Sequence, residues 1–178
     1  MSGAWVYICG PSGAGKDSVI EAARQIMGPQ PDIVFARRMI TRATQPGSDH
    51  DAVSDAGFLE LLKSGGLSWH WQAHGYSYGI ARSYERDVLA GRQVVINGSR
   101  AHVLGLAPAP DLRVIEITAD PQKVANRLIE RGRDSNSAVA SRLARNTSFS
   151  GLQADLVIVN DGALTVAGRC LADYLSKY

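Results

Sequence analysis

The sequence predicts an α/β fold in which a parallel sheet is covered by helices on both faces. Short apolar runs alternate with amphipathic segments along the 178 residues, and continuous apolar strands are typical of parallel sheets that are buried on both faces. The first apolar run, 4–9, is followed by Gly10 and Gly15-Lys16 in the spacing G-x-x-x-x-G-K, where an amphipathic segment begins. A glycine-rich loop between a strand and a helix indicates a phosphate-binding loop, which is found in this class of fold.

The elements follow from two patterns, taken in chain order. An apolar run bounded by turn residues predicts a buried strand, and apolar residues at helical spacing predict a helix. The strands are predicted at 4–9, 33–40, 92–97, 112–119 and 155–160. The helices are predicted at 16–27, 55–64, 82–90, 121–131, 138–148 and 164–175, and the aromatic stretch 67–79 is expected to be extended.

One domain is expected, because a length of 178 residues suits a single hydrophobic core. The sheet core is predicted to comprise 1–40, 81–130 and 139–178. Residues 41–80 are less regular and are expected to form a small insertion. The polar stretch 131–138 is expected to form a lid.

The composition argues against several classes of protein. The net charge is only +2, so nothing favours binding to nucleic acid or to a membrane surface. The two cysteines, Cys9 and Cys170, do not suggest a disulfide scaffold or a metal site. Residues 1–20 lack a basic leader with a long apolar region, and no apolar run approaches membrane-spanning length. A cytoplasmic protein is therefore expected.

The loop that ends at Lys16 has the chemistry to hold a nucleotide. Its glycines let backbone N–H groups wrap phosphates, the helix N-terminus adds partial positive charge, and Lys16 is expected to reach the β- and γ-phosphates. A plain glycine-rich turn before a helix is the alternative, but the strand before the loop and the helix after it favour phosphate binding. The predicted loop residues are Gly10, Pro11, Ser12, Gly13, Ala14, Gly15, Lys16, Asp17 and Ser18.

Asp17 stands where this motif normally carries Ser or Thr. A carboxylate beside a triphosphate is repelled unless a cation lies between them, and Mg²⁺ prefers oxygen ligands, carboxylates included. Asp17 is therefore a candidate metal ligand. The alternative is that the helix dipole alone favours an acidic residue in the first turn. Ser18 cannot simply replace the missing hydroxyl, because one residue turns a helical side chain by about 100°.

Motifs along nearly the whole chain resemble those of the guanylate-kinase-like nucleoside monophosphate kinases. The resemblance implies a P-loop NTPase core, an acceptor-binding insertion, an arginine-bearing lid, and Mg²⁺-ATP as the phosphoryl donor. The matching segments are "GPSGAGK" (10–16), "RRMITR" (37–42), "AVSDAGF" (52–58), "HGYSYGI" (74–80), "RLIERGRD" (127–134), "SRLAR" (141–145) and "VIVNDG" (157–162).

The acceptor site departs from the guanylate kinase pattern. Guanylate kinases usually carry the motif T-R-x-x-R, and here Gln45 occupies the position of its second arginine. The tyrosine that contacts the acceptor phosphate aligns with His50, and the glutamate that reads guanine aligns with Trp69. Ile80 replaces the small hydroxyl residue that follows Tyr78-Gly79 in the family, and "NGS" (97–99) replaces the acidic motif at the end of the central strand. Indole offers no acceptor to the N–H groups of guanine, so recognition of that base should fail.

The same departures resemble a second, closer family, the ribose 1,5-bisphosphate phosphokinases of phosphonate breakdown. The resemblance implies phosphorylation of ribose 1,5-bisphosphate by ATP, giving 5-phosphoribosyl 1-diphosphate (PRPP) and ADP. An acceptor without a base fits the loss of the guanine-reading groups. The segments that carry it are "GPSGAGKDS", "RRMITR", "LSWHWQAHGYSYGI", "VVINGSRAHV" and "RLIERGR".

The resemblance and the charge of the substrates together suggest roles for individual residues. The implied catalytic residues are Lys16, Arg131, Arg133 and Arg142, and Asn160 is implied on the adenine side. The candidate acceptor residues are Arg38, Thr41, Arg42, Trp69, Tyr78 and Arg100. Arg37 and Arg38 should face opposite sides of a strand, so at most one of them is expected in the site. Arg100 is a hypothesis from charge, since a bisphosphate requires two anchors.

Several interpretations stay open at this point. Arg127 and Arg145 are as compatible with an ordinary role, either a solvated helix position or an ion pair, as with a role in the site. Trp69 is equally compatible with core packing and with a wall of the acceptor site, whereas packing is favoured for Trp71. A nucleoside monophosphate kinase with altered base preference and a non-catalytic binding module are the alternative functions. The expected partner is a small-molecule substrate, and a homodimer is left open.

Overall fold

The computed structural model describes residues 3–44, 49–130 and 151–177. The chain forms two compact units. The first unit comprises Met1–Val6, Gln30–Asn97 and Ala109–Leu112. The second unit comprises Tyr7–Pro29, Gly98–Pro108 and Arg113–Tyr178.

Five strands form one sheet in the order β2-β7-β1-β8-β9, in which the strands do not follow chain order. Pairing is parallel where β2 meets β7 and where β8 meets β9. All of β1 after Ala4 is buried, as expected for a strand covered on both faces. The α/β prediction is confirmed. The strands are β1 (Ala4–Cys9), β2 (Ile33–Phe35), β7 (Gln93–Asn97), β8 (Leu112–Thr118) and β9 (Leu156–Val159).

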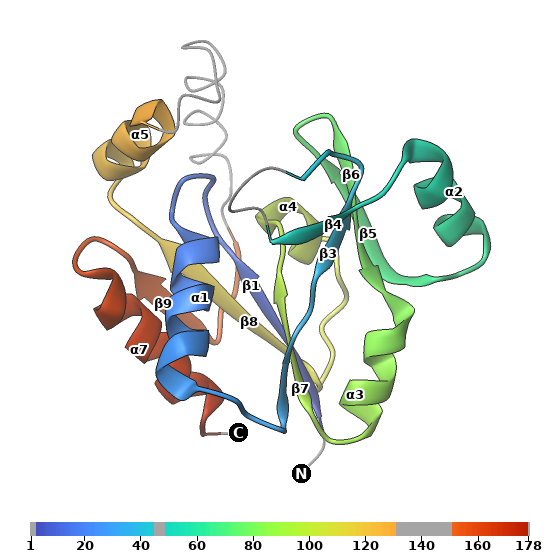
Figure 1. Ribbon diagram of the computed structural model, residues 1–178. Helices are drawn as coiled ribbons and strands as arrows, with labels where there is room; N and C mark the ends of the chain where they lie inside the picture. The colour runs from blue at the N-terminus through green and yellow to red at the C-terminus, as the bar shows by residue number, and fades with distance from the viewer. Residues whose placement is uncertain (1–2, 45–48, 131–150, 178) are drawn as a thin grey trace. The chain divides into compact units, whose positions relative to one another are not determined.

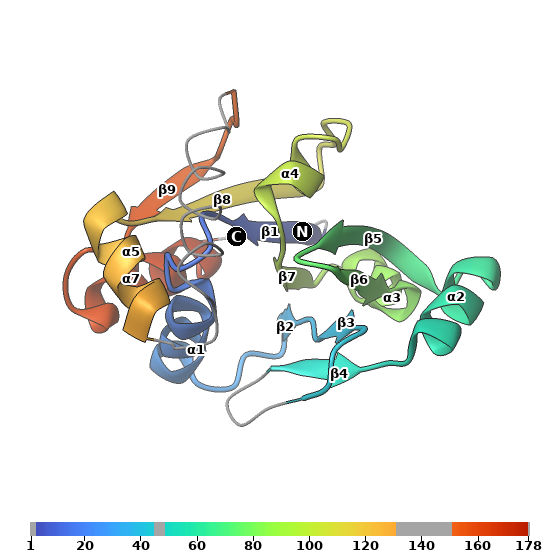
Figure 2. The same cartoon turned by 90° about the horizontal axis from the view of Figure 1, so that it is seen from above.

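The second unit carries helices on both faces of its strands. Helices α1 (Lys16–Met27) and α7 (Leu164–Leu175) lie side by side on one face (Figure 1). They approach closely at Gly168, where an added Cβ would lie 2.6 Å from the Cβ of Ala22. The short helix α4 (Arg100–Val103) lies on the other face (Figure 2), and α5 (Pro121–Glu130) follows β8. The helices predicted at 16–27 and 164–175 are confirmed.

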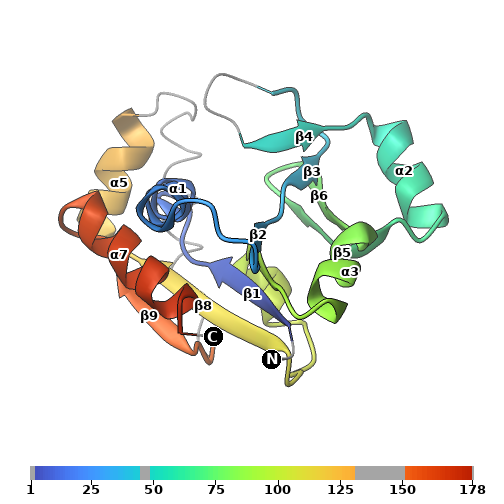
Figure 3. The same cartoon turned by 60° about the horizontal axis from the view of Figure 1, so that its bottom comes forward.

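The first unit holds a separate four-stranded sheet in the order β4-β3-β6-β5. The hairpin β5–β6 turns at His74 and Gly75, which both have positive φ, as two-residue hairpin turns prefer. Helix α2 (Asp55–Lys63) lies beside this hairpin (Figure 3), with its N-terminus capped by the Ser54 side chain. The remaining elements are β3 (Arg38–Ile40), β4 (His50–Ala52), β5 (Leu67–Ala73), β6 (Tyr76–Ala81), η1 (Arg82–Tyr84) and α3 (Glu85–Leu89).

The strand predicted at 33–40 is wrong, because the chain divides there into β2 and β3, which belong to different sheets. The backbone N–H of Ala36 still bonds to Val95 of the first sheet, whereas Arg38 pairs with His50 of the second. The division falls at Arg37, whose side chain bonds to Asp51 of β4 and to Asp49, which directly precedes β4. The short elements β4 and α4 were not predicted.

Part of the prediction lies outside the described residues. This holds for the lid expected at 131–138 and for the helix expected at 138–148. Within the residues that the structure describes, no helix has both the length and the apolar character needed to cross a membrane.

Candidate active site

The loop between β1 and α1 has the backbone conformation that its glycines predict. Gly10, Gly13 and Gly15 have φ values of 145°, 90° and 87°, which side chains rarely tolerate. At Gly10 a Cβ would also lie only 1.9 Å from the carbonyl oxygen of Ile117, so a larger residue cannot fit without movement. The loop therefore runs against β8 and delivers the chain to the first turn of α1.

Lys16 is the first residue of α1, and its ammonium group folds back over the loop. Its Nζ donates hydrogen bonds to the carbonyl oxygens of Gly10 and Pro11, both at 3.0 Å. Asp17 and Ser18 follow on the exposed side of the same turn. The structure thus brings one cation and one carboxylate to the N-terminus of α1, where backbone N–H groups favour anions.

The side chains of Asn160 and Arg127 both donate hydrogen bonds to a backbone carbonyl of the loop. The Asn160 side chain, only 5% exposed, donates a bond of 2.8 Å from Nδ2 to the carbonyl oxygen of Ala14. Arg127 on α5 donates to the carbonyl oxygen of Asn160 at 2.9 Å and to that of Ala14 at 3.5 Å. This contact is neither of the two ordinary roles considered for Arg127, the solvated helix position and the ion pair. In the sequence Arg127 stands four residues before Arg131, but this spacing does not reveal a carbonyl partner.

Tyr7 of β1 contacts the turn at residues 97–100 ("NGSR"), where β7 ends. The Tyr7 hydroxyl accepts a bond from the Ser99 N–H at 3.0 Å and lies 2.8 Å from Nδ1 of His102. Gly98 lies on the tyrosine ring, where a Cβ would be 2.0 Å from the ring carbon Cζ. Glycine is therefore required at this turn, which places Arg100 at the start of α4.

Arg100 is 8% exposed and lies 3.7 Å from the Glu116 carboxylate of β8. Burial lowers the pKa of the Arg100 guanidinium, and the charge of Glu116 opposes that shift. Burial, with a smaller contribution from Glu116, raises the pKa of the neighbouring Cys9 thiol to about 12. Cys9 is therefore a neutral, buried residue, and the sequence did not point to Glu116 as the partner of Arg100.

In the first unit, Thr41 and Arg42 form a turn that is bonded to β6. The backbone N–H of Thr41 donates to the carbonyl oxygen of Ser77 at 3.0 Å, and its hydroxyl accepts from the Ser77 N–H at 2.9 Å. The Arg42 guanidinium lies 5.6 Å from the centre of the Tyr76 ring, within cation–π range. His50 contacts the backbone of Arg42 from the other side.

The aromatic residues of this unit pack in pairs. The ring centres of Trp69 and Trp5 are 4.9 Å apart, and those of Trp71 and Tyr78 are 5.5 Å apart in a stacked arrangement. Trp71 and Tyr78 are both buried, which agrees with the packing favoured for Trp71. Trp69 makes a packing contact and is only partly buried.

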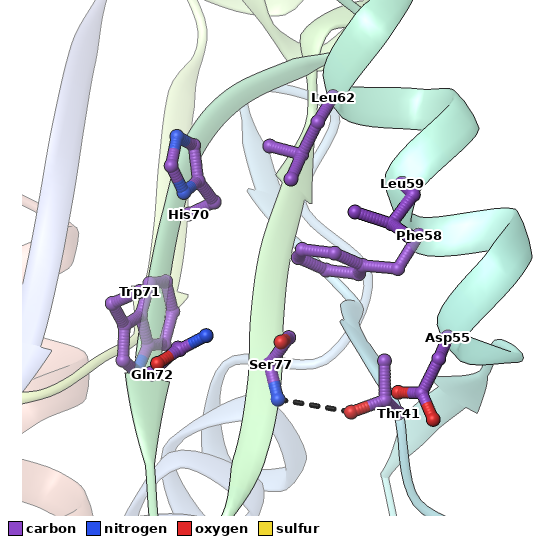
Figure 4. Close-up of a pocket in the computed structure, with 9 residues that line it drawn as sticks. All are labelled: Thr41, Asp55, Phe58, Leu59, Leu62, His70, Trp71, Gln72 and Ser77. Carbon is purple, nitrogen blue, oxygen red and sulfur yellow. Dashed lines mark hydrogen bonds between the residues drawn. The ribbon is translucent and has the colours of Figure 1, made fainter.

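A pocket of about 590 Å³ lies between α2 and the hairpin β5–β6 (Figure 4). Phe58, Leu59 and Leu62 of α2 point towards the strands, and Thr41 meets Ser77 at one end through their hydrogen bond. The lining is Thr41, Asp55, Phe58, Leu59, Leu62, His70, Trp71, Gln72 and Ser77. Thr41 thus belongs to the pocket and to the Arg42 turn.

Three catalytic candidates, Arg131, Arg133 and Arg142, lie outside the described residues, as do Gln45 and Arg145. Their roles stay predictions. Among the residues that are described, no three His, Cys, Asp or Glu side chains are grouped so as to hold a metal ion.

The sequence is similar to those of several known phosphokinases. The chain is 46% identical over 146 residues to the bifunctional ribose 1,5-bisphosphokinase-thymidine phosphorylase of Azorhizobium caulinodans, covering 81% of this chain but only 21% of that relative. It is 42% identical over 176 residues to the ribose 1,5-bisphosphate phosphokinase PhnN of Acidiphilium cryptum, covering 99% of this chain and 94% of that protein. No family model matches the sequence.

Structural comparison agrees with the α/β core. The guanylate kinase of Anaplasma phagocytophilum superposes with a TM-score of 0.71 at 19% identity, over 99% of this chain and 86% of that one. At this identity the likeness concerns the fold alone, which is the predicted P-loop NTPase fold.

Proposed function

The chain belongs to the ribose 1,5-bisphosphate phosphokinase family, and on this premise we propose that it transfers the γ-phosphoryl group of ATP to the 1-phosphate of ribose 1,5-bisphosphate. The products are PRPP and ADP. The observation that carries the proposal is the 42% identity over 94% of a phosphokinase of that name. The loop from Gly10 to Lys16, with the conformation described above, supports ATP as the donor.

The proposed reaction needs little acid–base chemistry. An oxygen of the acceptor 1-phosphate attacks the γ-phosphorus, a new phosphoanhydride bond forms, and the bond to the β-phosphate bridging oxygen breaks. The attacking oxygen is already anionic, so catalysis consists of positioning and charge neutralisation. Lys16 is proposed to hold the β- and γ-phosphates. Arg131, Arg133 and Arg142 are proposed to neutralise the transferring oxygens.

The ATP site is proposed to rest on the braced loop. Backbone N–H groups of Gly13 and Gly15 and the N-terminus of α1 supply donors for the phosphates. Asn160 and Arg127 hold the carbonyl of Ala14, so the loop keeps its shape without help from the ligand. Preorganised donors of this kind stabilise developing charge without reorganisation during the reaction.

Mg²⁺ is proposed to accompany ATP, and the donors present fit this ion. Mg²⁺ is usually held by one or two carboxylates together with phosphate oxygens and water, and it needs no cage of protein ligands. Asp17 is an exposed carboxylate in the first turn of α1, directly after Lys16. The bound ion would neutralise phosphate charge there, and Asp17 would hold it directly or through water.

Replacing Asp17 with asparagine should raise the Mg²⁺ concentration needed for half-maximal ADP release by about tenfold, because one charged ligand contributes on the order of 1.4 kcal/mol. The acceptor KM should change little. Calorimetric titration of the ADP-bound protein with Mg²⁺ provides a readout that does not depend on turnover. Glu21→Gln, on an exposed part of the same helix, is the control. An unaltered Mg²⁺ dependence would leave Asp17 only its favourable interaction with the helix dipole.

The acceptor is proposed to bind through Arg38, Thr41 and Arg42 at one phosphate and through Arg100 at the other. Trp69 is proposed to form a wall where guanine would otherwise lie, and Tyr78 is proposed to contact the acceptor. Trp69 packs on Trp5 and offers no hydrogen-bond acceptor, which supports an acceptor without a base. Cytoplasmic location and a homodimer stay predictions.

A coupled assay of ADP release tests the proposal directly, with ribose 1,5-bisphosphate and GMP compared as acceptors. We expect kcat/KM for ribose 1,5-bisphosphate to exceed that for GMP by at least about a hundredfold, because unpaired polar groups on the base are costly. A preference for GMP would favour a nucleoside monophosphate kinase. No ADP release with any phosphorylated acceptor would favour a binding module.

A further inference from the structure

Arg37 binds three consecutive residues around β4. Its Nε donates to the Asp51 carboxylate at 2.9 Å, and its two terminal nitrogens donate to the Asp49 carboxylate at 2.7 Å and to the backbone carbonyl of His50 at 3.2 Å. The hydroxyl of Tyr84 accepts the Arg37 backbone N–H at 3.0 Å. The hydrogen bond and charge of Asp51 raise the pKa of the Arg37 guanidinium. The guanidinium group of Arg37 therefore bonds to groups of the protein.

His50 lies between these two carboxylates in the sequence and turns its side chain inward. It is 2% exposed, and its Nε2 lies 3.1 Å from the backbone carbonyl oxygen of Arg42. A carbonyl oxygen can only accept, so Nε2 carries the hydrogen in this contact. A buried donor with this partner fixes the position of the Arg42 backbone, and losing it would leave the carbonyl without that bond.

The Arg42 backbone is therefore held from two sides. Thr41 is bonded to Ser77 of β6, and His50 bonds to Arg42 from β4. The parallel pairing of β3 with β4 sets Arg38 opposite His50, which fixes the distance between the two ends of the loop that joins them. The Arg42 side chain then leaves this anchored turn over the ring of Tyr76.

We infer that Arg37, Asp49, His50 and Asp51 form a clasp that positions Arg42 for the acceptor phosphate. The inference rests on the proposed function, since it assumes that Arg42 binds the acceptor. Arg37 and His50 are positioning residues in this clasp and do not contact the substrate. Of the neighbouring pair Arg37 and Arg38, the clasp assigns Arg37 to the protein and keeps Arg38 as the acceptor residue.

The test compares His50→Phe, which keeps a ring but removes the N–H donor, with His50→Gln, whose amide can donate to the same carbonyl. We expect His50→Phe to raise the acceptor KM about tenfold, with kcat and the ATP KM changed less than about twofold, because only acceptor positioning is affected. His50→Gln should recover most of the loss. Gln25→Phe, which introduces the same ring at an exposed position of α1, is the control and should have no effect.

A double-variant comparison separates positioning from direct binding. In an Arg42→Ala background, His50→Phe should add less than about a twofold change in acceptor KM, since the group that it positions is gone. Arg37→Gln should behave like His50→Phe, whereas Arg82→Gln, at an exposed ion pair of η1, should not. A full additional tenfold effect in the double variant, or an unchanged acceptor KM in His50→Phe alone, would overturn the inference.

Hydrogen exchange tests the clasp without any acceptor. The backbone amides of 41–44 and 49–53 should exchange at least about tenfold faster in His50→Phe and in Arg37→Gln than in the unaltered protein, because these bonds limit local opening. Unchanged exchange would refute the clasp. If the unaltered protein fails to use ribose 1,5-bisphosphate, the proposed function is wrong, and the exchange rates alone decide whether the clasp exists.

Discussion

Replacing Lys16 with methionine is expected to lower kcat by about a thousandfold, the upper range for removing one preorganised charge from a phosphoryl-transfer site. The ammonium group donates to two backbone carbonyls of the loop, and in its proposed role it would exchange these partners for the β- and γ-phosphates. Methionine keeps the length and the apolar stem but loses the charge. The acceptor KM should change little, because Lys16 is proposed to act on the donor.

The measurement is the rate of ADP release at saturating ATP and ribose 1,5-bisphosphate. Lys63→Met, in the exposed last turn of α2, is the control and should keep full activity. The thermal midpoint of Lys16→Met should stay close to that of the unaltered protein, since the bonds from Lys16 to the loop carbonyls are only partly buried. A loss of less than about tenfold in kcat would contradict the role given to Lys16.

The features that could be predicted from the sequence are those that depend on neighbours in the chain. The phosphate-binding loop was recognisable because its backbone needs positive φ at several positions, and glycine at those positions marks this requirement in the sequence. The helices α1 and α7 were predicted with their observed bounds, since apolar spacing and end signals are local. Trp69 and Asp17 could likewise be singled out from the sequence, because each stands where its motif normally carries another residue type.

The features that were missed depend on partners far along the chain. Arg127 bonds to Ala14, 113 residues away, and nothing near either residue marks the pair. Where the predicted strand divides, Arg37 bonds to Asp49 and Asp51, which lie 12 and 14 residues farther along the chain. An apolar run has the same alternation whether it forms one strand or two, so its pattern cannot reveal a change of sheet.

Replacing Gly10 with alanine is expected to reduce the free energy of unfolding by about 3–5 kcal/mol, through the sum of overpacking and backbone strain. An added Cβ would lie 1.9 Å from the carbonyl oxygen of Ile117, a backbone atom of β8, which is paired with β9 on one side and lies inside the sheet. The residue also has a φ of 145°, which alanine tolerates poorly. Relief requires a shift of the loop, so ATP binding should weaken together with stability.

Gly75→Ala separates the two causes of this loss. Gly75 also has a positive φ, 77°, but a Cβ there meets nothing within 4 Å. Its substitution should therefore cost only about 1–2 kcal/mol, the strain of a left-handed residue alone. Denaturant unfolding gives both free energies, and calorimetry with ATP gives the binding loss. Equal losses of unfolding free energy in the two variants would show that the contact with Ile117 relaxes freely. The positive φ, and not the packing of the loop against β8, would then be what requires glycine at position 10.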